Sequence, residues 1–222
     1  GAGGGGVVWK ENLQGESIYN EGQEPMPEEM AKNVQDYYNP YYKGLHSLIG
    51  SLREKMGYGE ILFLDAHSFP GNVDVPKIGL VGSEPKPIFI LGSQGNTKAS
   101  EEVMNWLLEA LVRNAPSKEN VPDLYENISE VAVADSRRGW GGFHNVEYFG
   151  QPDGIKDNIM GDVSDDDTEI DFKIHAVQLE TNMSTFFNDG KYNKEYLEAM
   201  RQTIQKSLDE VGQKLKEKNK KV

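Results

Sequence analysis

The sequence predicts an α/β protein, a three-layer sandwich in which helices cover both faces of a mixed, mostly parallel sheet. Several segments, among them 99–113 and 197–215, repeat apolar residues at intervals of three and four, as helices with one buried side do. Strands that alternate with helices are typical of this fold class. Four short apolar segments have the length and composition of buried strands: 61–64, 87–93, 128–134 and 173–180.

The chain is predicted to form a single domain over residues 1–222, with GAGGGG (1–6) as a flexible tail and a hairpin around Gly15. Residues 162–171 include six acidic residues in ten, but they lack the spacing and the glycine of a calcium loop. We therefore expect a solvated loop between the third and fourth strands.

A long helix is predicted before the first strand. Pro25 and Pro27 introduce it, and apolar residues recur at intervals of three and four up to Met56. Because a proline inside a helix removes an N–H donor and crowds the preceding turn, Pro40 is expected to kink this helix or break it in two.

Composition excludes several classes of function. The net charge of −13 and the pI of about 4.8 argue against a surface for nucleic acid or for an anionic membrane. Without cysteine the chain has no disulfide or thiolate metal site, so a metal would be held by His, Asp or Glu. No apolar run comes close to the length of about 20 residues that is needed to span a bilayer. These features fit a cytoplasmic protein, and they do not specify its oligomeric state.

The first candidate site is ILFLDAHSF (61–69), where an apolar strand runs into an acid, an imidazole and a hydroxyl. Ligands of open α/β sheets bind beyond the carboxyl ends of the strands. Asp65 and His67 point to the same side because side chains alternate along a strand. Both could bind a metal, or Asp65 could orient His67 from behind. A strand end capped by its neighbours explains this segment, taken alone, equally well.

The second candidate site is HAVQLE (175–180). Val177 and Leu179 belong to the core, so Gln178 and Glu180 reach the opposite face or the end of the strand. A carboxylate in an apolar strand is costly to bury unless it has a partner, which makes Glu180 a candidate general base or metal ligand. A solvated glutamate at the strand end is the alternative.

Two further segments carry polar groups in glycine-containing turns. SRRGWGGFHN (136–145) offers Arg137, Arg138 and His144 for binding a carboxylate or an oxyanion, although a plain surface loop is as good an interpretation. SQGNT (93–97) could present backbone N–H groups to an anion, or Thr97 could simply be the N-cap of the next helix.

Four groups of segments follow one another along the chain: VVWKENLQGESIYN followed by YYNPYYKGL, then ILFLDAHSFPG, then PIFILGSQGNTKAS, and finally GGF…YFG followed by HAVQLETNMSTFFND. Taken together and in order, they resemble the N-formylglutamate amidohydrolase family. The resemblance spans about Val7 to Leu208. It implies a zinc-dependent amide hydrolase with a phosphorylase/hydrolase-like fold, in which one Zn²⁺ activates water to attack a small N-acyl amino acid or peptide.

Carried over to this chain, the resemblance implies that His67 binds the metal, and Asp65 is the second candidate ligand because of its position beside His67. Glu180 would take a proton from the water and pass it to the leaving amine. An arginine should bind the substrate carboxylate by bidentate pairing, with Arg138 as the catalytic candidate. The remaining residues expected to bind the substrate are Arg137, His144, His175, Gln178, Ser93 and Thr97.

The chain also departs from the family pattern. The family's earlier strand, with its Pro-His-x-Gly segment and further metal ligands, has no counterpart here, so we expect the domain to be incomplete at its N-terminus. Two alternative functions therefore stay open. One is a metal-free binding or scaffold protein on the same fold, and the other is a cell-wall amidase or carboxypeptidase that uses the same chemistry.

Overall fold

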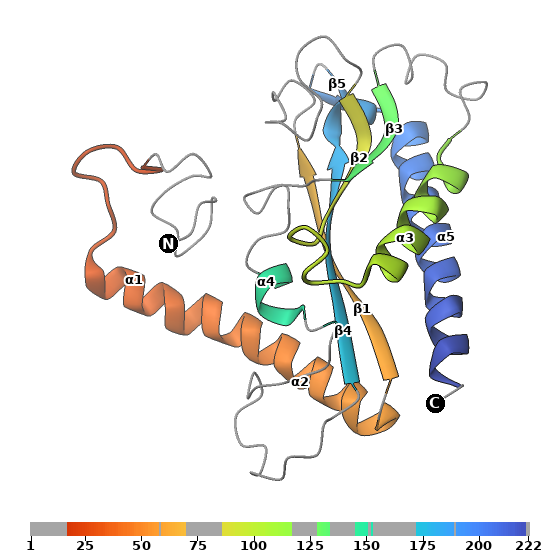
Figure 1. Ribbon diagram of the computed structural model, residues 1–222. Helices are drawn as coiled ribbons and strands as arrows, with labels where there is room; N and C mark the ends of the chain where they lie inside the picture. Colours follow the sequence, from red (N-terminus) through yellow and green to blue (C-terminus); the bar gives the residue numbers. More distant parts are fainter. Residues whose placement is uncertain are drawn as a thin grey trace. The chain divides into compact units, whose positions relative to one another are not determined.

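The computed structural model in Figure 1 describes residues 17–57, 59–69, 86–116, 128–133, 145–150, 152, 172–188 and 190–220. The chain divides into two compact units, Gly1–Tyr58 with Asp157–Thr168 and Gly59–Lys156 with Glu169–Val222. The hairpin expected around Gly15 and the acidic segment 162–171 lie outside the described residues. The single-domain organisation stays a prediction.

The first unit contains one helical stretch: α1 (Pro27–Asn33), a π-helical segment η1 (Val34–Tyr38) and α2 (Asn39–Met56). The N–H of Asn39 bonds to the carbonyl of Val34, five residues earlier, as in a π-helix. The helix therefore does not break at Pro40, because the wider turn before it accommodates the missing donor and the ring. Gly57, with a φ of 70°, ends α2 as the pattern indicated.

The second unit is built on a four-stranded sheet with the order β1-β4-β2-β3. Its strands are β1 (Gly59–Phe69), β2 (Lys86–Gly92), β3 (Ile128–Val133) and β4 (Phe172–Asn182). The pairs β1/β4 and β2/β3 are parallel, whereas β2 and β4 are antiparallel. The prediction of a mixed, mostly parallel sheet is confirmed.

Strand β1 is longer than its apolar pattern indicated. The apolar run ends at Leu64, yet the strand continues to Phe69 because each residue from 65 to 69 has a partner in β4. Asp65 and His67 consequently lie within the sheet and not just beyond it. Their side chains lie on the same face of the sheet as the side chains of the β4 residues with which they pair.

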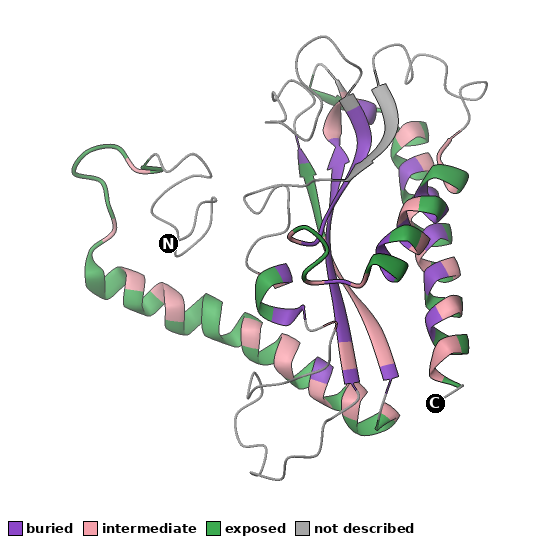
Figure 2. Ribbon diagram, viewed as in Figure 1, coloured by how far each residue is buried: buried purple, intermediate pink, exposed green. Residues whose placement is uncertain are grey.

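Helices lie on both faces of this sheet. The helices α3 (Glu101–Asn114) and α5 (Lys194–Asn219) cover one face, and the short α4 (Asn145–Phe149) lies over the other (Figure 1). β4 is buried along nearly all its length, and α3 and α5 turn their buried sides to each other (Figure 2). The core between the sheet and these two helices includes Phe89, Leu91, Val103, Leu107, Leu111, Val177, Leu179 and Val211.

The buried stripe of α5 differs in detail from its apolar pattern. Leu197 is 41% exposed, whereas Thr203 and Ser207 are buried. The Thr203 hydroxyl donates to the carbonyl of Asn114 at 2.9 Å, and the Ser207 hydroxyl donates to the carbonyl of Thr203 at 2.8 Å. Because both hydroxyls are satisfied by backbone acceptors, these small polar residues can be buried on α5 without cost from an unpaired group.

Residues beyond β4 form a 3₁₀ turn (Met183–Thr185) and a two-stranded ribbon of β5 (Phe187–Asn188) and β6 (Lys191–Tyr192). Asn193 then caps α5 by accepting hydrogen bonds from Glu195 and Tyr196. Among the described helices, none combines the length and the apolar content that crossing a membrane requires.

The core predicts a difference between two chemically identical substitutions. Leu107→Ala removes a side chain that is 1% exposed between the sheet and α5, so it should lower the free energy of unfolding by about 2–5 kcal/mol. Leu197→Ala, at an exposed position of α5, should change it by no more than about 0.5 kcal/mol. Urea denaturation of both variants measures the difference, and equal losses would contradict this packing.

Candidate functional site

The register of β1 and β4 brings the two candidate segments together. Asp65 pairs with Gln178, and His67 pairs with Glu180. Side chains of paired residues in adjacent strands lie on the same face, so all four project to one side of the sheet. This is the side of α4, whose Phe149 ring stacks on Phe63 of β1 with 5.0 Å between ring centroids. The sequence segments DAH and QLE therefore form one site.

Asp65 and His67 form a pair within β1. The Nε2 atom of His67 lies 3.1 Å from Oδ2 of Asp65, and Oδ1 of Asp65 accepts a hydrogen bond of 3.2 Å from the Asn145 side chain. Both oxygens of Asp65 are thus engaged. Of the two roles that the sequence left open for Asp65, this geometry favours orienting His67 over binding a metal directly.

The same contact sets the charge of His67. The hydrogen bond to Asp65 raises the pKa of the His67 imidazole above its ordinary value, and the charges of Asp65 and Glu180 act in the same direction against partial burial. The side chain of His67 is about half exposed (49%). Among the residues that the structure describes, none bonds to its Nδ1 atom.

Glu180 is the most buried acid of the site. It is 7% exposed, and its Oε1 accepts a hydrogen bond of 2.6 Å from the side-chain amide of Gln178. No described group bonds to the other oxygen, Oε2, although this atom is buried. A solvated glutamate at a strand end is therefore not what the structure shows.

Burial raises the pKa of the Glu180 carboxyl above its ordinary value, and the charge of Asp65 raises it further. The hydrogen bond from Gln178 and the charge of His67 act in the opposite direction. A carboxylate that is held by one oxygen, with the other oxygen free and its pKa raised, is suited to accept a proton from a nearby water.

The turn after β2 borders this site, because Gly92 pairs with Gln178. Ser93 is buried, and its hydroxyl donates to the Asn96 side chain at 3.2 Å. Thr97 donates to the carbonyl of Gln94 at 2.8 Å, so it is not the N-cap of α3. That cap is Ser100, which accepts from the N–H of Val103 because the helix begins three residues later than Thr97 would require. A role of Ser93 and Thr97 in binding substrate stays a prediction.

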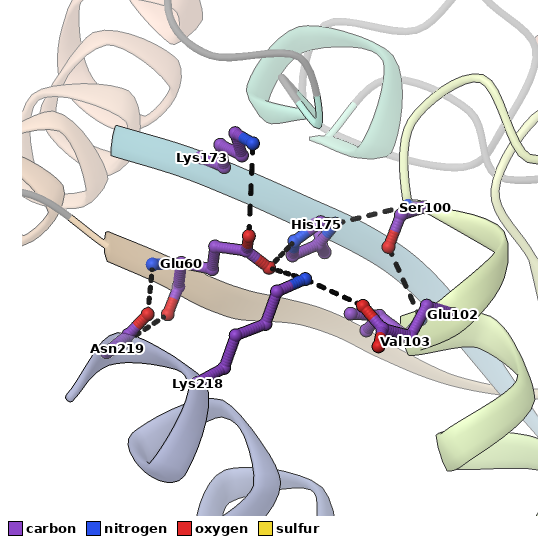
Figure 3. Close-up of polar contacts among 8 residues, drawn as sticks. All are labelled: Glu60, Ser100, Glu102, Val103, Lys173, His175, Lys218 and Asn219. Carbon is purple, nitrogen blue, oxygen red and sulfur yellow. Dashed lines mark hydrogen bonds and ion pairs between the residues drawn. The ribbon is translucent and has the colours of Figure 1, made fainter. Parts of the chain in front are cut away.

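His175 lies on the other face of β4, with Val177 and Leu179. It is 1% exposed, and its two ring nitrogens contact the backbone N–H of Ser100 and the carboxyl of Glu60 (Figure 3). The structure does not bring His175 together with Glu180, from which it is separated by five positions, or roughly 16 Å, along the strand. Its role in binding substrate stays a prediction.

Arg137, Arg138 and His144 lie outside the described residues, so their proposed roles also stay predictions. Two residues that the structure brings forward were not among the predicted site residues. Asn145, which binds Asp65, ends the glycine-rich segment and carried no signal of its own. Glu60 did carry one, because an acid at the start of a buried strand needs a partner.

The donor set suits a metal only in part. An imidazole whose second nitrogen contacts a carboxylate, as in the His67–Asp65 pair, is the usual arrangement of a metal-binding histidine. A catalytic zinc takes three protein ligands. No group of three potential ligands occurs within the part of the chain that the structure describes. The described residues therefore supply one suitable ligand, His67, beside the acid Glu180.

Comparisons with known proteins agree with the family resemblance that the sequence segments indicate. The model of the N-formylglutamate amidohydrolase family matches residues 1–187. A crystal structure of N-formylglutamate amidohydrolase from Ralstonia eutropha JMP134 is similar with a TM-score of 0.64 and 16% identity, over 97% of this chain. This chain spans 65% of the length of that structure. A search of curated proteins finds no match. At this identity the structural similarity shows the fold, and the predicted fold class is confirmed.

The contact between Asp65 and His67 makes a prediction about titration. In metal-free protein, Asp65→Asn should lower the pKa of His67, because the substitution removes the carboxylate that favours the charged imidazole. NMR titration of the imidazole measures this pKa. Glu60→Gln, which changes the acid next to His175, is the control and should leave His67 unaffected. An unchanged pKa of His67 in Asp65→Asn would show that the pair does not form.

Proposed function

The chain belongs to the N-formylglutamate amidohydrolase family, and on this premise we propose that it hydrolyses the amide bond of a small N-acyl amino acid such as N-formylglutamate. One observation carries the proposal. Glu180 is a buried carboxyl with one oxygen held by Gln178 and the other without a partner among the described residues, on the face that also bears His67. Amide hydrolysis by water needs such a base.

Glu180 accepts a proton from water at Oε2 while the water oxygen attacks the carbonyl carbon of the substrate. The proton then passes to the amide nitrogen, the C–N bond breaks, and for N-formylglutamate the products are formate and glutamate. Gln178 keeps Oε1 occupied, which restricts the proton to the other oxygen. The raised pKa of Glu180 supports both steps, since a stronger base takes the proton from water more readily and still releases it to an amine.

The proposed cofactor is zinc, with His67 as one ligand through Nδ1. Asp65 accepts the Nε2 proton of His67 and so holds the neutral ring with Nδ1 as the donor atom, while Asn145 fixes Asp65. When bound, the metal would lower the pKa of a water and polarise the scissile carbonyl.

The role of Glu180 predicts a specific loss. Glu180→Gln should lower kcat for formate release from N-formylglutamate by about 10²- to 10⁴-fold, because the amide cannot accept the proton. The variant should be at least as stable as the wild type at neutral pH, since it removes a buried carboxylate whose pKa is raised.

Glu195→Gln, on the exposed first turn of α5, is the matched control and should keep full activity. Undiminished formate release by Glu180→Gln would rule out the proposed base. If the wild-type protein cleaves other N-acyl compounds but not N-formylglutamate, the proposed reaction stands and the proposed substrate is wrong.

The proposed metal predicts both composition and activity. Elemental analysis of the protein should find zinc, and removing it with a chelator should abolish hydrolysis until zinc is restored. His67→Ala should lower the zinc content by removing a ligand, and Lys191→Ala, on the exposed ribbon, should not. Full activity in protein shown to be free of metal would contradict this part of the proposal.

A further inference from the structure

A second polar cluster lies on the opposite face of the sheet, near the amino-terminal ends of β1 and β4. Figure 3 shows Glu60 of β1 and Lys218 of α5 directed toward His175 of β4. Lys218 lies 3.0 Å from Oε2 of Glu60 and 2.6 Å from Glu102 of α3. Lys173 lies 3.9 Å from the other oxygen of Glu60. The proposed reaction uses none of these groups.

The hydrogen bonds of His175 define its protonation state. Its Nδ1 accepts the backbone N–H of Ser100 at 3.1 Å, so this nitrogen carries no proton. Nε2 lies 3.0 Å from Oε2 of Glu60 and must be the nitrogen that donates. His175 is thus neutral, with its proton on Nε2, and it serves as acceptor to one backbone group and donor to one carboxylate.

The Ser100 N–H belongs to the end of the turn that borders the proposed site. Next to His175, the N–H of Ala176 donates to the carbonyl of Lys98 at 2.8 Å. The turn 93–100 is therefore tied to β4 at its far end by two hydrogen bonds. Its near end follows Gly92, the partner of Gln178. Residues 175–178 of β4 form the support of this turn.

The turn has little room to shift and a strained backbone. Gln94, Gly95 and Asn96 all have positive φ angles, of 53°, 66° and 62°. Such conformations are uncommon for residues other than glycine and persist only where their surroundings impose them. On another side the turn meets Gly150, where a Cβ atom would lie 2.8 Å from the carbonyl oxygen of Lys98.

We propose that neutral His175 is the positioning residue for the far end of the turn 93–100, and that protonation of His175 at Nδ1 releases Ser100 from β4. A protonated Nδ1 cannot accept the N–H of Ser100, and two donors would then face each other. Release would leave the turn tied to β4 through Lys98 and Ala176 alone, with the helix α3 intact from Glu101 onward.

The charged groups around His175 come from every element packed against it. Glu60 of β1 favours a proton on the ring, whereas Lys173 of β4 and Lys218 of α5 oppose it, and Glu102 of α3 is paired with Lys218. Burial has the largest effect, and the pKa of His175 lies below its ordinary value.

Because the pKa of His175 is lowered while the turn is held, the imidazole binds a proton more tightly once the turn is released. The turn is therefore fully held above the ordinary histidine pKa of about 6.5. As the pH falls from there toward the lower pKa of the held state, each pH unit favours release about tenfold.

Amide hydrogen exchange at Ser100, corrected for the intrinsic rate, tests the proposal in the wild-type protein. Protection should fall as the pH is lowered from about 7.5 to about 5.5, by at most about tenfold, while amides in the middle of α3 keep theirs. Protection of Ser100 that does not depend on pH would overturn the proposal.

Two variants separate positioning from general stability. His175→Asn places an amide oxygen close to the position of Nδ1 and does not titrate, so Ser100 should exchange with no dependence on pH over this range. His175→Leu keeps the volume but offers no acceptor, so Ser100 should lose protection at both pH values. If the Leu variant does not fold, the Asn variant decides: the same acid-dependent loss as in the wild type would refute the role of His175.

Discussion

The parallel register of β1 and β4 is the constraint on which the rest of the structure depends. It sets Asp65 beside Gln178 and His67 beside Glu180, in a part of the sheet where β4 is buried. A slip of one residue would move every side chain of one strand to the other face and separate these groups. Contacts within each strand and with α4 hold the polar side chains: Asp65 contacts His67 and Asn145, and Gln178 contacts Glu180. The same register leaves one oxygen of Glu180 without a described partner, which is the feature suited to chemistry.

β4 performs different tasks on its two faces. Gln178 and Glu180 face α4, and His175 faces α3 and α5 together with Val177 and Leu179. The two histidines of the sheet illustrate how the surroundings decide their charge. His67 is half exposed and contacts a carboxylate, so its pKa is raised, whereas His175 is buried and its pKa is lowered although it too contacts one. The exposed imidazole is suited to binding a ligand, and the buried one to fixing the backbone.

Local patterns in the sequence predicted much of the fold. The apolar segments located the four strands of the main sheet, and alternation in HAVQLE assigned Val177 and Leu179 to the core and Glu180 to the opposite face or the strand end. Patterns could not reveal that β1 continues through Asp65 to Phe69, because partners in β4, about 110 residues away, extend it. The contact of Asn145 with Asp65 likewise depends on tertiary packing. The N-cap at Ser100 is local, and the glutamates that follow it are its sequence signal. Of the kink or break expected at Pro40, the break does not occur, because a π-helical segment accommodates the proline.

This register places the Glu180 carboxyl next to His67, and burial leaves it a stronger base than an ordinary glutamate. The most direct test is the pKa of this carboxyl in metal-free protein, measured by carbon-detected NMR of labelled glutamate, with Glu180→Gln to assign the signal. Because the carboxyl is buried, its pKa should lie above the ordinary value. The pKa should be higher still in His67→Gln, where a neighbouring positive charge is lost. An ordinary or lowered pKa that does not respond to His67→Gln would contradict it.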